Sequence, residues 1–359
     1  MKQTGSKSSK SALEAKYDAQ KIAFAPVAFQ VARSLRDLGI LERIHRGRND
    51  GVSVEDIASD LDLSAYGVRV LLEFAASIDL VALDAGLYRL TKTGLFILSD
   101  TLTRVNMDFI HDVCYRGLFH LKEAIVEQAP AGLTVFGNWQ TIYQGLSSLP
   151  ADVQKSWFAF DHYYSDMAFP DVLPIVFKRR PRRLFDVGGN TGRWAVACTE
   201  TDPEVKVTVL DLPGQLVKAR QTIREMGLEN RIDCREFDIL EADPPFPGGA
   251  DAIWMSQFLD CFSEDQIVRI LTLTATGMRP DTDLYILEPF CDRQRFDAAR
   301  YSLQATSLYF TCMANGNSKM YHSEEMIRCA ARAGLAVVEE FDDLGICHTL
   351  LRCRLQRRP

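Results

Sequence analysis

The chain contains no long apolar segment, no excess of basic residues and no paired-cysteine motif. Because no apolar run approaches about 18 residues, we expect no transmembrane helix, and the start MKQTGSKSSKSALEAK lacks the apolar core of a signal peptide. A cytoplasmic location is therefore expected. The net charge of −7 argues against a nucleic-acid-binding surface. Nine cysteines occur without a C-x-x-C pair, which predicts reduced thiols and no metal site.

The N-terminal third has the pattern of a winged helix. Apolar residues recur at helical spacing from Ile22 to Leu41, Ser53 heads a second helix, and Ser64 heads a third over 65–78. The segment VALDAGLYRLT then predicts a hairpin that turns at residues 84–86. The 359 residues leave room for a second domain, because single cores stop growing at about 250–300 residues.

A winged helix raises the question of DNA binding. Its third helix, where base-reading side chains would lie, carries Arg69 as its only cation, whereas phosphate contacts need several. We therefore expect dimerisation rather than DNA binding. The apolar residues expected in the domain core and the dimer interface are Phe24, Phe29, Leu71, Leu72 and Phe74.

A glycine-rich turn lies near the middle of the chain, in RLFDVGGNTGRWAVACTETDPEVKVTVLDLP (183–213). The pattern predicts a strand, a tight turn, a helix and a second strand that ends at Asp211. Glycines let the backbone approach a ligand, and Asn190 tolerates positive φ. An acidic residue at the end of the second strand accepts hydrogen bonds from ribose hydroxyls in this topology. The unit therefore predicts a nucleoside site.

The loop also indicates which nucleoside binds. Val187 replaces the first glycine of the dinucleotide fingerprint G-x-G-x-x-G. Asp186 stands two residues before the first glycine, where a carboxylate would repel a pyrophosphate but suit the ammonium group of an amino acid. These two features favour S-adenosyl-L-methionine over NAD.

Three motifs together resemble a known family. DVGGNTG, VLDLP and SQFLDCFSEDQIVRIL (256–271) are similar to those of the class I S-adenosylmethionine-dependent methyltransferases, specifically the small-molecule O-methyltransferases with an N-terminal winged-helix dimerisation domain. The resemblance covers roughly residues 22–355. It implies an α/β fold with a Rossmann-like doubly wound sheet, preceded by an all-helical winged-helix domain. It also implies a homodimer that joins through this domain and binds a small-molecule acceptor, no nucleic acid and no membrane.

The expected parts of the chain follow from this resemblance. They are a disordered tail over 1–16, a winged-helix dimerisation domain over 17–98, a helical linker over 99–180 that contributes to the substrate pocket, and an S-adenosylmethionine-binding catalytic domain over 181–359.

The resemblance and the loop pattern together assign the site residues. Asp238 and Ile239 fall where the family holds the adenine ring. The predicted cofactor contacts are Asp186, Gly188, Gly189, Asn190, Gly192, Asp211, Leu212, Asp238, Ile239, Ser256 and Gln257. The linker is rich in aromatic residues, which suit a flat aromatic substrate. The predicted substrate contacts are Trp157, Phe158, His162, Tyr163, Met313 and Asn317.

One position departs from the family. Where the family reads L-H-D-W-S-D-E, with the histidine as base, this chain reads LDCFSED and places Asp260 at the histidine's position. A free aspartate has a pKa near 3.9 and a phenol near 10, a mismatch of about six units. Asp260 is thus a modified base, a residue that orients the acceptor, a sign of a ring-carbon acceptor, or an N-terminal helix cap, although Ser263 fits the cap better. Glu288 is predicted to face Asp260 as a catalytic partner.

The sequence therefore predicts a methyltransferase that uses S-adenosyl-L-methionine, releases S-adenosyl-L-homocysteine and acts on a small aromatic or phenolic metabolite. O-methylation is the first expectation and ring C-methylation the second, because of Asp260. The alternative is a protein of the same fold that binds S-adenosylmethionine but has non-methylating chemistry.

Overall fold

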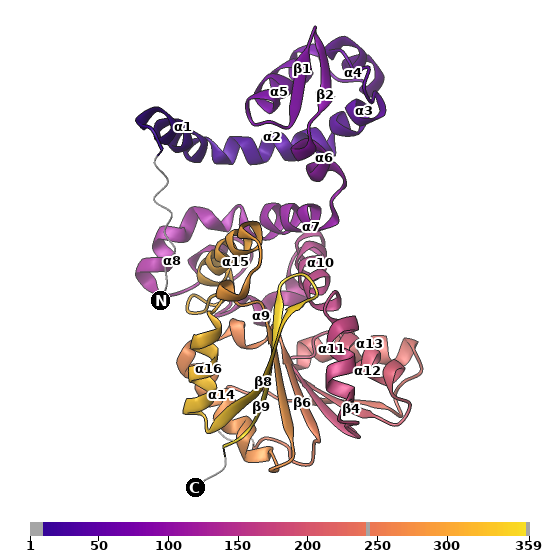
Figure 1. Cartoon of the computed structure of the whole chain (residues 1–359), viewed down its shortest axis with the longest axis vertical. Helices are drawn as coiled ribbons and strands as arrows, with labels where there is room; N and C mark the ends of the chain where they lie inside the picture. The colour runs from indigo at the N-terminus through magenta and orange to yellow at the C-terminus, as the bar shows by residue number, and fades with distance from the viewer. Residues whose placement is uncertain (1–9, 242–244, 357–359) are drawn as a thin grey trace. The chain divides into compact units, whose positions relative to one another are not determined.

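The computed structural model describes residues 10–241 and 245–356. The chain divides into two compact units, residues 1–107 and 108–359, which are coloured by residue number in Figure 1. The greater part of the predicted linker, residues 108–180, belongs to the second unit.

The first unit consists of helices and a two-stranded hairpin. Its elements are α1 (Ala12–Ala23), α2 (Ala25–Asp37), α3 (Ile40–Arg46), α4 (Val54–Leu61), α5 (Ala65–Ser77), β1 (Val81–Asp84), β2 (Leu87–Leu90), α6 (Lys92–Ser99) and α7 (Thr101–Phe109), the last of which runs into the second unit. The antiparallel hairpin gains a bridge between Val52 and Tyr88.

Local capping explains where these helices begin. The hydroxyl of Ser53 accepts a hydrogen bond from the Asp56 amide, and that of Ser64 accepts one from the Gly67 amide, as predicted for the starts of α4 and α5. The predicted helix over 22–41 is wrong in detail, because the chain breaks at Phe24 and turns again at Gly39, whose φ is 74°.

The predicted disordered tail over 1–16 is wrong for residues 12–16, which form the first part of α1. Ser11 and Glu14 make a reciprocal capping box that starts this helix. The rest of the predicted tail, residues 1–9, lies outside the described residues.

The second unit is built on a seven-stranded sheet with the order β5-β4-β3-β6-β7-β9-β8. Strands β3 to β7 pair in parallel, and β9 pairs antiparallel with both β7 and β8. The strands are β3 (Arg183–Val187), β4 (Lys206–Asp211), β5 (Ile232–Glu236), β6 (Ala252–Ser256), β7 (Asp283–Glu288), β8 (Leu335–Leu344) and β9 (His348–Leu355). The order reverses at β3 and β6, as in the predicted doubly wound sheet.

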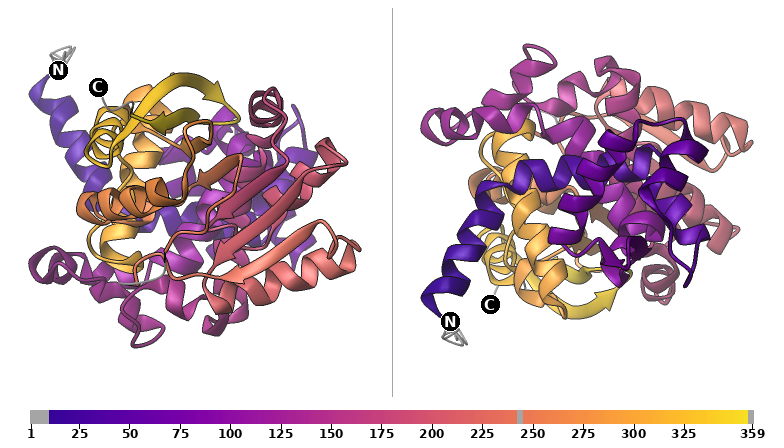
Figure 2. Two further views of the ribbon diagram at one scale, coloured as in Figure 1. Left: turned by 90° about the horizontal axis from the view of Figure 1, so that it is seen from below. Right: turned by 90° about the horizontal axis from the view of Figure 1, so that it is seen from above.

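Helices cover both faces of this sheet (Figures 1 and 2). Side chains alternate along a strand, so Ile253 and Met255 pack with α14 and α16, whereas Trp254 packs with α11, α12 and α13 on the other face. The helices of this unit are α8 (Leu121–Glu127), α9 (Ile142–Gly145), α10 (Ala151–Asp166), α11 (Phe169–Phe177), α12 (Arg193–Thr201), α13 (Pro213–Glu225), α14 (Glu264–Gly277), α15 (Asp297–Tyr309) and α16 (Ser323–Arg332).

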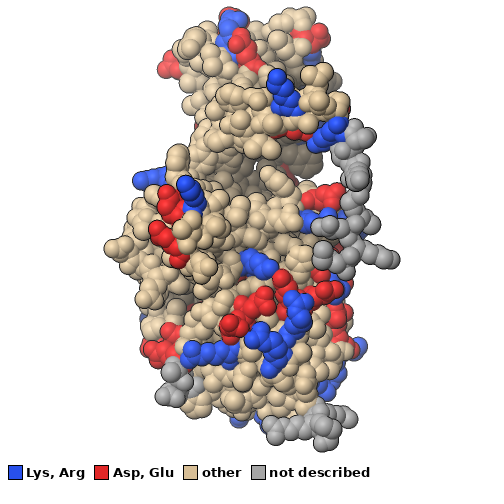
Figure 3. Space-filling model, turned by 90° about the vertical axis from the view of Figure 1, so that its left-hand side faces the viewer, with Lys and Arg blue, Asp and Glu red and all other residues tan. Residues whose placement is uncertain are grey.

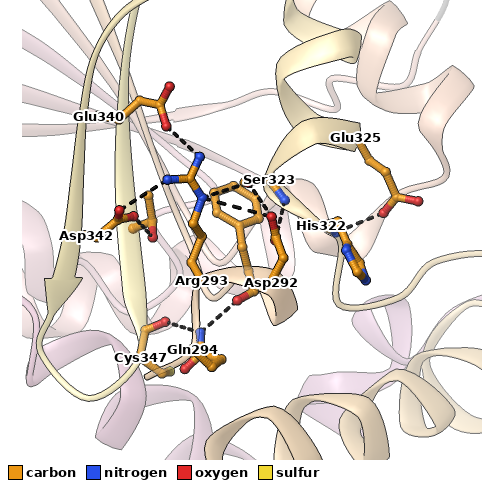
Figure 4. Close-up of polar contacts among 11 residues, drawn as sticks. Asp292, Arg293, Gln294, His322, Ser323, Glu325, Glu340, Asp342 and Cys347 are labelled. Atoms are coloured by element: carbon orange, nitrogen blue, oxygen red, sulfur yellow. Dashed lines mark hydrogen bonds and ion pairs between the residues drawn. The ribbon is translucent and has the colours of Figure 1, made fainter. Parts of the chain in front are cut away.

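A polar network fixes the segment between β7 and α15. Figure 4 shows Arg293 between side chains of α16 and β8, donating to Ser323 Oγ at 2.9 Å, to Glu340 at 2.8 Å and to Asp342 at 3.2 Å. The carboxylate of Asp292 accepts from the Ser323 amide at 2.7 Å. This network ties α16 and β8 to the chain that leads into α15, and α15 contributes to the pocket described below.

Candidate active site

A pocket of about 400 Å³ lies at the carboxyl ends of the parallel strands in the second unit. Residues that directly follow β3, β4, β5, β6 and β7 line its floor, which is where ligands bind in doubly wound sheets. Side chains of α9, α10 and α15 line much of the remainder, together with residues of α11 to α14 and of the segment 310–320. The volume falls in the range of small-molecule sites.

The glycine loop has no room for larger residues. Gly188 has a φ of 71°, and a Cβ atom there would overlap the ring of Phe258. A Cβ atom on Gly189 would lie 2.5 Å from the carboxylate oxygen Oδ2 of Asp186. The loop needs glycine at both positions, because any side chain would fill space beside the pocket or displace Asp186.

Backbone amides fix Asp211 at the end of β4. The amide of Asn190, whose φ is 50°, donates to Asp211 Oδ2 at 2.8 Å. The amide of Leu212 donates to Asp211 Oδ1 at 2.7 Å. Burial raises the pKa of Asp211 to about 6, and these two bonds limit the rise. The carboxylate is held in place with lone pairs left for ribose hydroxyls.

Asp186 is buried under the loop, with 2% of its surface exposed. Its Oδ2 atom has no hydrogen-bond partner among the described residues. Burial, followed by the charge of Asp211, raises the pKa of Asp186 to about 8. An unpartnered buried carboxylate is costly unless a ligand supplies a donor or a positive charge.

The residues around the loop fit S-adenosyl-L-methionine. Besides Asp186, the buried Asn190 Oδ1 and Ser256 Oγ atoms lack partners among the described residues, so polar ligand groups are needed there. Asp238 and Ile239 line the pocket beyond Asp211, as expected for an adenine site. The predicted cofactor residues that line the pocket are Asp186, Gly188, Gly189, Asn190, Asp211, Leu212, Asp238, Ile239, Ser256 and Gln257.

Gly192 is not among the residues that line the pocket, and its direct contact with the cofactor stays a prediction. It has a φ of 78° and forms the N-terminal cap of α12, and its nearest neighbours belong to Ala219 and Ile223 of α13. Its function is to turn the chain from the loop into the helix.

Asp260 faces the pocket from a short 3₁₀ helix over Leu259–Cys261. Only 4% of its surface is exposed. Burial raises its pKa to about 7, with a further contribution from the charge of Asp161. The helix-cap alternative is excluded because Ser263 caps α14 and forms a capping box with Gln266.

Glu288 is 2% exposed and does not line the pocket. Its Oε1 atom accepts hydrogen bonds from the amides of Phe258 at 3.1 Å and Leu259 at 2.8 Å. Burial, followed by the charge of Asp260, raises the pKa of Glu288 well above its usual range. Glu288 therefore holds the turn that carries Asp260, and its catalytic role stays a prediction.

Of the predicted substrate contacts, Trp157, His162 and Asn317 line the pocket. Phe158 and Tyr163 do not line it, and all five contacts stay predictions. Phe158 packs edge-on against Trp157 and lies under the Lys218 amine at 3.9 Å, and Tyr163 points to another side of α10 than Trp157 and Tyr164.

Met313, another predicted substrate contact, does not line the pocket either. Its side chain is fully buried and fills the space beside Gly117 and Gly132, away from the pocket. The pocket residues on this side are Asn315 and Asn317, which follow Met313 in the chain.

Several pocket residues were not identified from the sequence. They are Asp161 and Phe160 on α10, Tyr143 on α9, and Tyr309 on α15. The Trp157 indole donates to the Tyr309 hydroxyl at 2.8 Å, and the Tyr143 hydroxyl is buried without a partner among the described residues. Helical spacing could have identified one of these residues. Asp161 lies four residues after Trp157, so the two side chains share one face of the helix.

Two histidines lie on or next to the pocket: His162 lines it, and His348 contacts the lining residue Gln257. Burial lowers the pKa of His162 to about 4, and its Nε2 atom lies 3.1 Å from the Thr191 hydroxyl. His348 is also buried with its pKa lowered to about 4, and its Nε2 atom lies 2.8 Å from Gln257 Oε1.

Comparison with known proteins finds two matching domain models and several relatives. A Dimerisation2-like domain model matches residues 16–88, and an O-methyltransferase domain model matches residues 160–336. The 3-hydroxy-5-methyl-1-naphthoate 3-O-methyltransferase of Streptomyces sahachiroi is 32% identical over 273 residues, which cover 74% of this chain and 76% of the relative. The L-tyrosine C(3)-methyltransferase of Streptomyces lavendulae is 22% identical over 254 residues, 70% of this chain and 68% of the relative.

Solved structures share the fold over nearly the whole chain. The apo crystal structure of the S-adenosylmethionine-dependent methyltransferase SibL superimposes with a TM-score of 0.71 at 25% identity, and covers 94% of this chain and 98% of its own. The predicted fold class, cofactor and methyltransferase activity are thereby confirmed. The chain belongs to the S-adenosylmethionine-dependent small-molecule O-methyltransferase family.

Proposed function

We propose that this enzyme methylates a hydroxyl oxygen of a small aromatic metabolite, with Asp260 as the general base. The observation that carries the proposal is a buried carboxyl group, at the position of the family's histidine, in a pocket walled by Trp157, Phe160 and Tyr309. Aromatic side chains at this position suit the faces of a flat ring.

The carboxyl group of Asp260 is suited to accept a proton from a phenol. Its pKa of about 7 narrows the gap to a phenol, whose pKa is about 10, from about six units to about three. A base whose pKa lies near the working pH is the most effective in general base catalysis. Glu288 supports this role by fixing the backbone amides beside Asp260.

S-adenosyl-L-methionine, when bound, supplies the electrophilic methyl group. The chain's own contribution is to hold the two reactants. Asp211 and Asp238 bind the nucleoside, and Asp186 balances the positive charge of the ammonium group at the amino-acid end. The aromatic walls orient the acceptor. Holding both reactants in line replaces a bimolecular encounter with an oriented one, which contributes much of the rate enhancement in transfers of this kind. Asp260 accepts the proton that the acceptor hydroxyl loses.

Methylation of a ring carbon is the second candidate. Asp260 replaces the histidine of the O-methylating family pattern, and a relative at 22% identity is named as a tyrosine C(3)-methyltransferase. In that reaction, the same carboxylate would accept the phenol proton to activate the ring, and the ring carbon would lose its own proton after methylation.

The two outcomes are separated by the position of a label. We would incubate the protein with a panel of phenols and cofactor labelled with ¹³C in the methyl group, and locate the label by mass spectrometry and NMR. A methoxy signal supports O-methylation and an aryl-methyl signal supports the ring-carbon alternative. Cofactor binding without label transfer to any phenol would contradict the proposed acceptor class.

We also propose that two copies of the chain join through the first unit. The matched Dimerisation2-like domain supports this, as does the row of exposed apolar side chains on α1 and α2, which comprises Leu13, Tyr17, Ile22, Phe24 and Val27. Light scattering of the intact protein would test it. Replacement of Ile22 and Phe24 by Asp should yield monomers, and a wild-type monomer would contradict it.

A nucleic-acid partner is not part of the proposal. Arg69, the only cation on α5, pairs with Glu55 at 2.8 Å. Figure 3 shows acidic and basic side chains mixed on the face of the second unit that carries α14 and α16, rather than a basic patch. Among the described residues, no helix has the length and apolar character needed to cross a membrane.

A further inference from the structure

Helix α10 is joined to the glycine loop and its following helix by side-chain contacts. The Asn190 amide group donates to Asp161 Oδ2 at 3.0 Å, the Thr191 hydroxyl lies 3.1 Å from His162 Nε2, and Arg193 pairs with Asp166. Helix α10 therefore lies against the glycine loop at Asn190 and Thr191, the loop residues that follow Asp186 and the two glycines. Its position relative to the loop is fixed by polar groups rather than by apolar packing alone.

Asp161 is the acidic residue of α10 that lines the pocket. It lies near the cofactor loop through its bond to Asn190, and its backbone carbonyl accepts a hydrogen bond at 3.5 Å from the side chain of Gln257, which follows β6 and precedes the turn that carries Asp260. Asp166, on the same helix, does not line the pocket. Burial raises the pKa of Asp161 to about 7. A positively charged ligand group beside the carboxylate would lower this pKa again.

Asp161 thus lies between the residues that hold the two reactants. The reacting centre of the cofactor is a sulfonium, which is positive before transfer and becomes a neutral thioether afterwards. A carboxylate beside it attracts the substrate form of the cofactor more strongly than the product form. Arg193 is the only Lys or Arg among the described residues that line the pocket, and it is already paired with Asp166.

We propose that Asp161 is a further cofactor-binding residue, which faces the sulfonium and makes the pocket prefer S-adenosyl-L-methionine over S-adenosyl-L-homocysteine. Loss of the positive charge on transfer then weakens the hold on the product and favours its release. Because the interaction is strongest before transfer, it lowers KM without raising kcat.

The test is calorimetric titration of the intact protein with both compounds. Asp161→Asn keeps the shape and an acceptor for Asn190 but removes the charge. The affinity for S-adenosyl-L-methionine should fall about tenfold, which corresponds to about 1.4 kcal/mol, while the affinity for S-adenosyl-L-homocysteine stays nearly unchanged. In turnover, KM for the cofactor should rise while kcat is maintained.

A matched control is Asp152→Asn, which removes an exposed carboxylate in the first turn of the same helix, outside the pocket lining. It tests whether the loss of one negative charge on α10 is enough, and it should leave the ratio of the two affinities unchanged. Equal losses for both compounds in Asp161→Asn would overturn the proposal and place Asp161 at the amino-acid end or in a structural role. Unchanged affinities for both compounds would overturn it as well.

Discussion

The substitution Asp260→Asn tests the proposed base most sharply. The carboxyl group is 4% exposed and its pKa is raised to about 7, mainly by burial. Transfer of a proton from a phenol of pKa about 10 to this group costs roughly 4 kcal/mol, against roughly 8 kcal/mol for a free aspartate, because each pKa unit corresponds to about 1.36 kcal/mol. The fold therefore halves the cost of making the phenolate.

Asparagine keeps the shape of the side chain but cannot accept the proton as a carboxylate does. General bases contribute about 10²–10⁴-fold to the rate, so we expect kcat of Asp260→Asn to fall at least about 100-fold at pH 8. The affinity for S-adenosyl-L-methionine should be unchanged. A substitution at the fully exposed Asp297, Asp297→Asn, removes one charge far from the pocket lining and controls for general electrostatics.

The pH dependence of kcat is a second, independent test of the base. Wild-type kcat should rise as the pH passes about 7, because Asp260 must lose its proton to act as a base. The variant should lack this rise and should approach the wild type near pH 10, where a phenol ionises unaided. A full wild-type kcat in the variant would refute the base assignment. An equal deficit at every pH would instead indicate that Asp260 only orients the acceptor.

Three further substitutions test the site and the fold. Asp186→Asn should abolish cofactor binding in calorimetry yet raise the Tm of the free protein, and raise it more at pH 8 than at pH 5. The native pKa of Asp186, about 8, lies above the unfolded value of about 3.9, so ionisation destabilises the native state progressively as the pH rises between them. A Tm that is unchanged at both pH values would contradict the buried, unpartnered carboxylate. Gly188→Ala, at a φ of 71° and against the Phe258 ring, should weaken cofactor affinity at least about tenfold while circular dichroism stays native. Asp283→Ala should lower the free energy of unfolding in urea by roughly 3 kcal/mol, because it removes the buried carboxylate that pairs with Arg352 at 2.8 Å and with Arg354 at 2.6 Å and leaves Arg352 with Glu339 alone. An unchanged midpoint would show that these ion pairs are not stabilising.

Features encoded by short stretches of sequence were predictable. The glycine loop and Asp211 lie at consecutive strand ends, so a strand–turn–helix pattern places them together without knowledge of the rest of the chain. Serine caps such as Ser53 and Ser64 act within four residues and were also readable. The same rule would have found α1, because its capping box is present, but the polar composition of the segment favoured disorder instead.

Features set by tertiary packing were not predictable. Met313 and Asn315 are two residues apart, and only the glycines packed against Met313 determine which of them faces the pocket. The ring of Phe158 packs against the amine of Lys218, a residue of α13, and does not line the pocket. The shifted pKa values of Asp161 and Asp260 depend on burial by several elements, so the sequence could show that the family's histidine is missing but not that the replacing carboxyl group can act as a base.

The most direct test of the account is a crystal structure of the protein with S-adenosyl-L-homocysteine and a methylated phenol. We expect the adenine beside Asp238 and Ile239, the ribose hydroxyls on Asp211, and the acceptor oxygen or ring facing both the sulfur atom and Asp260. Electron density for the nucleoside outside the pocket, or an acceptor turned away from Asp260, would contradict the assignment.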